Sequence, residues 1–301
     1  MAMGSTTDEG DGRPEAAGVA DRVVAEIELA LAGDNLELPT LPDAPLRVWA
    51  ALEGKDPEIR DIVAAMESDP ALAARLLRLA NSVAYFGSRS VDNLHDTVVR
   101  VGLLGVRRVV LAVMVAQLYS SRGHPLEPLL AEAWEWSTLV ASLSRRLAAQ
   151  TPRLDEGVAL LAGLVHNVGV LPIIDFAERH PRLCEDRQEL ARVIARMQAP
   201  VGAMVAQRWG FPATLADVIA HLQDPDYAPR DTDDYVGVVR AAVALAELSR
   251  TGALVAGEDG VGDVTLLDTT WSGADARVLA EQGEEEARLL RLALADLPAN
   301  P

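Results

Sequence analysis

The sequence predicts an all-α protein with a large core made of aliphatic side chains. Half of its 301 residues are hydrophobic, but aromatic residues make up only 4% of the chain. The interior must therefore be filled mainly by Leu, Val and Ala, and such residues favour closely packed helices. No segment shows sustained alternation of apolar and polar residues, so we expect strands to be minor, with residues 264–267 as the candidate.

Helical periodicity accounts for most of the chain after residue 18. Residues 1–18 hold few large apolar side chains, and we expect a flexible tail because they cannot bury enough surface to offset the entropy of ordering. Residues 106–118 are apolar on nearly all sides, which predicts a helix at the centre of the bundle. Helices are expected, in chain order, over residues 19–31, 46–52, 57–66, 70–83, 90–98, 106–118, 129–149, 155–165, 171–180, 186–197, 200–209, 212–222 and 274–297.

Several of these helices begin with a capping signal. Asp56-Pro57 and Asp69-Pro70 each place an acceptor at the N-cap and a Pro at the first helical position, where the missing N–H costs nothing. Asp186 and Glu189 have the spacing of a capping box. These signals predict where three helices start.

Prolines and charged pairs organise the second half of the chain. Pro200 and Pro212 each predict the start of a further helix. Glu284 and Arg288 have the i,i+4 spacing of a helical ion pair. Residues 257–262 resemble a calcium loop only superficially, because they lack its regular oxygen ligands, and we interpret them as an ordinary loop.

The charge balance argues against contact with nucleic acid or membrane. The formal net charge is −18, from 45 acidic and 27 basic side chains, and such a surface repels phosphate backbones and anionic lipids. Arg100, Arg107 and Arg108 form the one basic cluster, which we interpret as a solvated helix face. We therefore expect no direct nucleic-acid partner.

Cysteine content and hydropathy indicate a cytoplasmic protein. The single cysteine, Cys184, excludes an intrachain disulfide and a Cys-rich zinc site, and we expect it to serve in packing. Residues 1–20 lack the basic start and apolar stretch of a secretory signal. Residues 109–116 appear as the most apolar segment, well short of the ~20 residues needed to cross a bilayer. We expect no membrane contact.

Two separate regions of the chain hold a set of segments that is informative in combination: Leu38-Pro-Thr-Leu-Pro42 and residues 69–82, 98–111, 134–137, 162–171 and 201–212. Together they span roughly residues 36–249, and the combination is far more specific than any single piece. In this combination the chain resembles the HDOD family, the HD-related output domains of bacterial signal transduction.

The resemblance implies an N-terminal helical lobe packed on a C-terminal bundle related to the HD phosphohydrolases. On this basis we divide the chain into a tail (1–18), an N-terminal lobe (19–120), an HD-like bundle (121–250) and a C-terminal loop and helix (251–301). The resemblance also implies regulation instead of catalysis. Because no receiver, cyclase or DNA-binding segment accompanies this region, we expect a stand-alone output protein that acts on a signalling protein partner.

The residues at the positions of the HD motif support a non-catalytic protein. The His-Asp pair that would hold divalent metals in that superfamily is His166-Asn167 here, and an amide brings no charge to offset a dication. The first ligand His, expected just before Ser137, is Trp136, whose indole offers only an N–H donor. We expect this ring to fill the space where metal and water would sit.

The other expected ligand positions are also altered. The His expected before residue 201 falls near Gln198, and the one expected after residue 219 falls at Leu222-Gln223, or at His221 if the register is shifted by one. The position of the last Asp holds Glu247. Of the expected set, His166, Glu247 and His221 are left as candidate ligands, and we predict no metal, no other cofactor and no catalytic residue.

Three functional hypotheses follow from these residues. The first is a non-catalytic signalling module that works by protein–protein contact. The second is a module that binds a nucleotide or another small signal in the vestigial pocket, with His166, Asn167 and Gln198 as hydrogen-bonding groups. The third, and the weakest, is a residual metal-dependent phosphohydrolase that uses His166 and Glu247.

Overall fold

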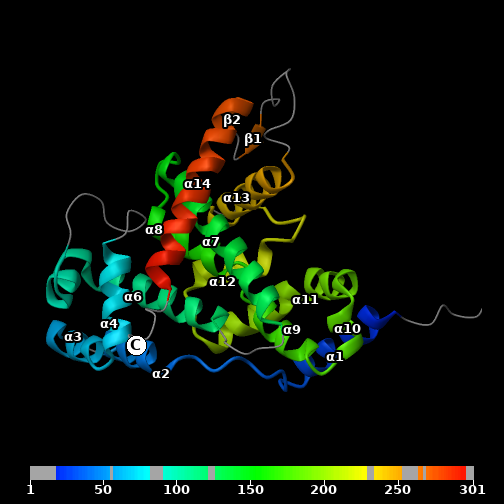
Figure 1. Ribbon diagram of the computed structural model, residues 1–301, viewed down its shortest axis with the longest axis horizontal. Coiled ribbons are helices and arrows are strands. Elements are labelled where there is room, and N and C mark those ends of the chain that lie inside the picture. The colour runs from blue at the N-terminus through cyan, green and yellow to red at the C-terminus, as the bar shows by residue number, and fades with distance from the viewer. Residues whose placement is uncertain are drawn as a thin grey trace, which may run out of the picture.

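The computed structural model describes residues 18–54, 57–81, 91–120, 126–228, 234–252, 264–266 and 269–295 (Figure 1). Over these residues the protein is all-α, which confirms the predicted fold class. The elements are α1 (Val19–Ala32), α2 (Asp43–Leu52), α3 (Ile59–Glu67), α4 (Pro70–Ala80), α6 (Leu94–Tyr119), α7 (Glu127–Ala149), α8 (Glu156–Val165), α9 (Val170–Ala177), α10 (Pro181–Glu185), α11 (Arg187–Arg208), α12 (Ala213–His221), α13 (Tyr235–Arg250), β1 (Val264–Leu266), β2 (Thr269–Trp271) and α14 (Gly273–Leu294). β1 and β2 pair as a short antiparallel hairpin.

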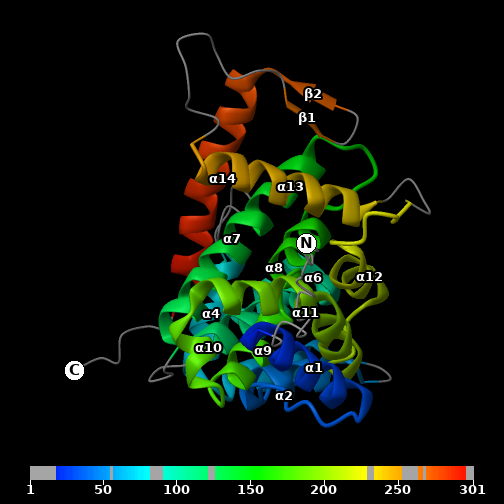
Figure 2. The same ribbon diagram turned by 90° about the vertical axis from the view of Figure 1, so that its right-hand side faces the viewer.

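Helix α7 lies at the centre of the second half of the molecule. It packs against α8, α13 and α14 (Figure 2). Glycines allow the close approach: a Cβ at Gly163 of α8 would lie 2.6 Å from Ala141 Cα, and one at Gly283 of α14 would lie 2.4 Å from a methyl carbon of Leu143. The small residues therefore set the spacing of the bundle that carries the candidate site.

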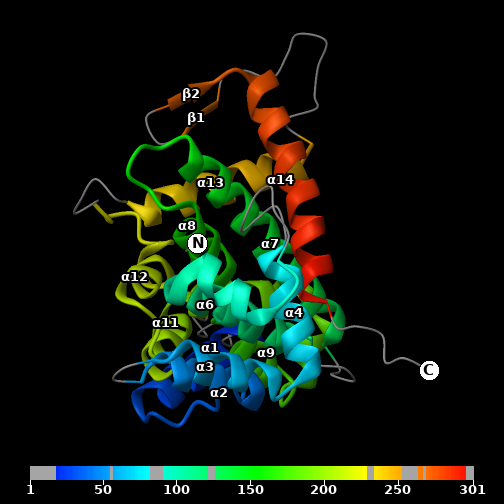
Figure 3. The same cartoon turned by 90° about the vertical axis from the view of Figure 1, so that its left-hand side faces the viewer.

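Helices α2, α3, α4 and α6 form a layer in the first half of the chain (Figure 3). Two predicted helices in this layer are one element, α6, interrupted at Gly102 (φ 70°, ψ 170°). Only glycine adopts such a conformation easily, so the bend falls at Gly102. Residue 90, where the first of these helices was expected to begin, lies outside the described residues, and Asn93 caps α6 by accepting the Asp96 N–H.

Helix α1 belongs spatially to the second half of the chain. It packs on α10 and α11, while residues 33–42 lead along the molecule to α2 (Figure 1). Glu189, on the first turn of α11, accepts the Ala20 N–H at 2.9 Å. The predicted capping box is thus half formed: Asp186 accepts the N–H groups of Gln188 and Glu189, but the Glu189 carboxylate reaches across to α1.

Two proline-based predictions differ from the structure. The helix expected at Pro57 begins at Ile59, and Asp56 lies outside the described residues. Pro200 does not begin a helix but lies inside α11. The buried residues of α11 continue at four-residue spacing through Val193, Met197, Val201 and Val205, so burial of one unbroken face outweighs the single N–H that proline lacks. By contrast Asp69 caps α4 as predicted, accepting the Leu72 N–H at 2.9 Å.

Charged side chains mostly join neighbouring helices. Arg107 pairs with Glu53 and Arg108 with Asp155, so these two guanidinium groups are neutralised and do not form a free basic patch. The expected Glu284–Arg288 pair is wrong, because Arg288 pairs with Glu285 at 2.6 Å.

The longest apolar stretch is not the one that the sequence suggested. Residues 156–177 are apolar and long enough to cross a membrane by length and composition. An 18-residue window within them has a mean hydropathy of 2.0, but 89% of that window is buried inside the protein. It comprises α8, the turn that carries His166 and Asn167, and α9. The stretch therefore forms the core around the candidate site.

Candidate functional site

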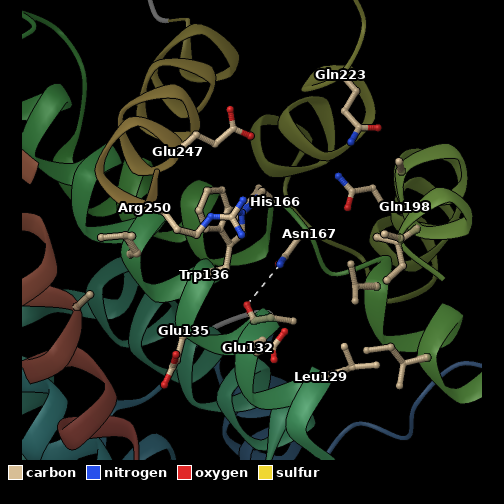
Figure 4. Close-up of a pocket in the computed structure, with 18 of the residues that line it drawn as sticks. Leu129, Glu132, Glu135, Trp136, His166, Asn167, Gln198, Gln223, Glu247 and Arg250 are labelled. Carbon is tan, nitrogen blue, oxygen red and sulfur yellow. Dashed lines mark hydrogen bonds between the residues drawn. The ribbon is translucent and has the colours of Figure 1, made fainter. Parts of the chain in front are cut away.

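A cavity of about 1000 Å³ opens between α7, the α8–α9 turn, α11, α13 and α14 (Figure 4). It is lined by five residues that the sequence placed at HD positions: Trp136, His166, Asn167, Gln198 and Glu247. Its lining residues are Leu129, Glu132, Ala133, Glu135, Trp136, Leu139, His166, Asn167, Val170, Ile174, Ala191, Ile194, Ala195, Gln198, Gln223, Glu247, Arg250, Glu284, Ala287 and Arg291.

His166 lies at the floor of this cavity, at the C-terminal end of α8, with only 5% of its surface exposed. Its Nδ1 lies 2.6 Å from the Gly163 carbonyl oxygen, so Nδ1 carries the proton and donates. Burial lowers the pKa of His166 to about 4. The ring is therefore neutral near pH 7, and its Nε2 lone pair is available as an acceptor.

Asn167 is held by hydrogen bonds from two other helices. Its Oδ1 accepts the Ser137 hydroxyl at 2.7 Å and the Tyr119 hydroxyl at 2.9 Å. Its Nδ2 donates to the Ala133 carbonyl oxygen at 3.4 Å, the bond drawn in Figure 4. An amide oxygen has two lone pairs, so both are used within the protein.

Two glycines bring the α8–α9 turn against α11. A Cβ at Gly169 would lie 2.2 Å from the Gln198 carbonyl oxygen and 2.7 Å from the Gly202 amide nitrogen. A Cβ at Gly202 would in turn lie 2.6 Å from Cγ2 of Ile219. This contact of backbone against backbone places Gln198 on the same cavity as His166, although the two are far apart in sequence.

Trp136 lines the cavity but does not fill it. Its ring is partly buried, and the Arg250 guanidinium carbon lies 5.3 Å from the ring centroid, within the range of a cation–π contact. We expected the indole to occupy the space of a metal and its water, and the cavity of about 1000 Å³ shows that this was wrong. The physical reason is that the ring packs beside Arg250 at the wall (Figure 4).

Gln198, Gln223 and Glu247 complete the set of positions suggested by the HD motif. The amide groups of Gln198 and Gln223 are turned toward the same space, and Glu247 lies near them on α13 (Figure 4). His221 is not among the lining residues; its Nδ1 lies 3.4 Å from Asp224. Of the two alternatives at this position, Gln223 lies at the cavity and His221 does not.

Sequence reasoning missed the residues that hold the site and those that charge its rim. Tyr119 and Ser137 have no motif of their own, although Ser137 follows Trp136 directly. Glu132 and Glu135 lie on the same helix as Trp136, and helical spacing could have placed them. Glu284 and Arg291 come from α14, beyond the segment that resembles the family, so the sequence carried no signal for them.

Comparison with known proteins identifies the family of this chain. The model of the HDOD domain matches residues 38–225. The chain belongs to the HDOD domain family. The cavity thus lies within the matched part of the HDOD domain, except for the walls that α13 and α14 supply.

One curated relative matches part of this chain at low identity. A protein of Treponema pallidum (strain Nichols), described as an uncharacterized protein, is 26% identical over 215 residues. The match takes in 68% of this chain and 41% of the relative. The chain therefore spans less than half the length of the curated relative that it matches.

Solved structures share the fold of this HDOD protein. A protein of Shewanella amazonensis SB2B, provisionally named a metal-dependent phosphohydrolase, has a TM-score of 0.70 at 24% identity, covering 92% of this chain and 99% of the other. An HDOD domain protein with unknown function from Geobacter sulfurreducens has a TM-score of 0.60 at 24% identity, covering 90% and 98%. A protein of Marinobacter aquaeolei VT8, provisionally named a signal transduction protein, has a TM-score of 0.57 at 23% identity, covering 91% and 65%.

The side chains of this HDOD cavity do not fit a catalytic divalent metal. Among the residues described, no three His, Cys, Asp or Glu side chains come together to hold a metal ion. Asn167 Oδ1 is occupied by two hydroxyls, and Trp136 has no lone pair to offer. Nε2 of His166 and the exposed carboxylate of Glu247 are too few ligands for a hard dication in a catalytic site.

Proposed function

We propose that this chain is a non-catalytic regulatory module that acts by contact with a signalling protein. The observation that carries the proposal is the hydrogen bonding of Asn167: both lone pairs of its oxygen are taken by Tyr119 and Ser137. The position that would hold the metal in a phosphohydrolase instead ties the α8–α9 turn to α6 and α7. In this proposal Asn167 stabilises the packing of the helices and takes no part in metal binding.

The electrostatics of His166 support the same proposal. A metal-activated water needs charged ligands that offset a dication, whereas the buried His166 is neutral and its neighbour is an amide. The names of two structural relatives point in different directions, one toward phosphohydrolysis and one toward signal transduction. The donor set of this chain favours signal transduction.

Exposed apolar side chains on α6 offer a surface for a protein partner. Val99 and Leu104 are 59% and 61% exposed, and Leu103 is also exposed, beside the bend at Gly102. Leu104 borders a groove of about 340 Å³ whose walls include Leu111 and other aliphatic residues. Large apolar side chains gathered on one exposed face are typical of interaction sites. The partner would insert apolar side chains here, while the net charge of −18 keeps nucleic acid and anionic membrane away.

Two measurements test the proposal. Purified protein supplied with Mn²⁺, Mg²⁺ or Fe²⁺ is expected to release no phosphate from nucleotide phosphoesters, and metal-dependent turnover would contradict the proposal. Tagged protein is expected to retain a signalling partner from its own cells, and Leu104→Arg is expected to lose it. The matched control is Leu29→Arg, because Leu29 is 76% exposed on α1. If both variants retained the partner protein equally, the α6 surface would not be the site of contact.

A further inference from the structure

One ring nitrogen of His166 faces the cavity without a partner in the protein. The residue is 5% exposed, and its Nδ1 is bound to the Gly163 carbonyl. Within the described residues no hydrogen bond to Nε2 is present, and this atom is not among the fully buried ones that lack a partner, so the small exposed part of the ring opens to the cavity. Because the ring is neutral near pH 7, Nε2 is an acceptor. A ligand in the cavity is placed to supply an N–H or O–H donor.

The walls around this acceptor combine apolar surface with amide groups. Leu139, Val170, Ile174 and Ile194 give aliphatic contact, and Trp136 adds an aromatic ring. The amide groups of Gln198 and Gln223 face the same space and can each donate and accept (Figure 4). Apolar walls with a few convergent polar groups are typical of small-molecule sites, and planar heterocycles match both parts of this lining.

The charges at the rim select against anions. Four carboxylates line the cavity, from Glu132, Glu135, Glu247 and Glu284, against the two guanidinium groups of Arg250 and Arg291. Glu132 is paired with Arg187 at 2.6 Å. Arg250 lies over the Trp136 ring and Arg291 donates to the Thr138 hydroxyl at 2.8 Å, contacts that orient the two guanidinium groups without cancelling their charge. The three remaining carboxylates still outnumber these two guanidinium groups, so a phosphate would meet more negative than positive charge, and like charges repel. This lining disfavours the nucleotide that the sequence suggested.

We propose that the cavity binds an uncharged planar heterocycle with a ring N–H, of the free nucleobase or nucleoside class, which donates to Nε2 of His166. The inference rests on the proposed regulatory function, since the bound molecule would be the input to the module. Such a ligand would touch α7, α11, α13 and α14 at once. Its binding would therefore favour one packing arrangement of these helices over another. Such a shift between conformations would pass the signal to the partner protein.

Calorimetric titration of the full chain with defined nucleosides tests the inference. The probes with a ring N–H are guanosine, inosine and uridine, and the matched probes without it are 1-methylguanosine, 1-methylinosine and 3-methyluridine. At least one ring N–H nucleoside is expected to bind, with its methylated form at least about tenfold weaker because the methyl group removes the donor to Nε2 and blocks its close approach. The corresponding 5′-monophosphate is also expected to bind at least about tenfold more weakly.

Variants locate the binding. His166→Phe keeps an aromatic ring but removes the acceptor, and it is expected to weaken binding at least about tenfold. His166→Gln restores an acceptor and is expected to regain most of the affinity. His95→Phe is the matched control, because the His95 side chain is 64% exposed on α6 and does not line the cavity. If His166→Phe does not fold, Gln198→Ala replaces it and is expected to lower the affinity as well.

The charge of the rim is tested separately. Glu135→Gln removes one carboxylate and is expected to narrow the difference in affinity between the nucleoside and its monophosphate. The inference is overturned if no ring N–H nucleoside binds at millimolar concentration, if the monophosphate binds more tightly, or if the acceptor-deleting variants bind like the wild type. Release of phosphate from the monophosphates would instead contradict the proposed function, so the two failures are distinguishable.

Discussion

The hydroxyl of Tyr119, at the end of α6, donates to the side-chain oxygen of Asn167 at 2.9 Å. The same oxygen accepts Ser137 of α7 at 2.7 Å, so Asn167 joins the α8–α9 turn to both helices. α6 also packs on α2, α3 and α4. The floor of the cavity is therefore linked by hydrogen bonds to the helix that carries the exposed apolar residues.

Removing one hydroxyl from this cluster should destabilise the fold. Tyr119→Phe keeps the ring, which lies 5.4 Å from Trp134, but deprives the buried Asn167 oxygen of a donor. We expect the free energy of unfolding to fall by about 1–2 kcal/mol, measured by urea denaturation. Ser137→Ala should have a similar effect, and the double variant should be non-additive because both hydroxyls share one acceptor. An unchanged midpoint for both single variants would contradict the role given to Asn167.

The glycines at the α8–α9 turn should not tolerate a methyl group. Gly202→Ala would bring Cβ to 2.6 Å from Cγ2 of Ile219. We expect the free energy of unfolding to fall by about 1–3 kcal/mol. Gly169→Ala should cost more, because its Cβ would meet the backbone oxygen of Gln198, which cannot rotate away. Gly54→Ala is the control, since its Cβ would lie at an ordinary 3.4 Å from Ala51. Equal thermal stability of the three variants would contradict the close contact.

Burial of His166 should make stability depend on pH. Its pKa is about 4 in the folded protein against 6.5 for a free side chain, so the unfolded chain takes up the proton first as the pH falls. The contribution of His166 to the free energy of unfolding is fully present above pH 6.5. It is lost progressively as the pH falls to about 4, by up to about 3 kcal/mol. Denaturant unfolding over this range should show a steeper loss for the wild type than for His166→Gln. Parallel pH profiles would mean that His166 is not buried in its neutral form.

Two neighbouring glutamates on α14 should differ in their effect on stability. Glu286 is 4% exposed and pairs with Arg145 and Arg146 of α7. Glu286→Gln replaces the carboxylate that pairs with two partly buried guanidinium groups by a neutral amide. We expect the free energy of unfolding to fall by about 3 kcal/mol or more. Glu285 pairs only with the exposed Arg288, so Glu285→Gln should leave the unfolding midpoint unchanged. Similar effects of the two substitutions would show that the buried pair does not hold α14 on α7.

Sequence patterns predicted most of the helices, because the periodic burial of aliphatic residues is a local signal, but they missed α13 and the short α10. Asp69 and Asp155 cap helices at the predicted starts, and the short strand at residues 264–266 lies where it was expected. The errors come from local rules that tertiary packing overrode. Pro200 is accommodated inside α11, and Glu284 accepts the Ser249 hydroxyl of α13 at 2.6 Å instead of pairing with Arg288.

The site was only partly predictable for a related reason. The resemblance to the HDOD family located Trp136, His166, Asn167, Gln198 and Glu247, and all five line one cavity. The sequence could not show that Arg250 holds the indole at the wall, leaving space that we expected to be filled. Such contacts join helices far apart in the chain and depend on their packing.

Mn²⁺ titration by calorimetry shows whether the His166–Asn167 site can hold a catalytic dication. We predict no binding at micromolar concentration to the chelator-treated wild type or to Asn167→Asp, because one restored carboxylate beside His166 still leaves too few ligands. Stoichiometric Mn²⁺ binding by the wild type, abolished in His166→Phe, would contradict the account.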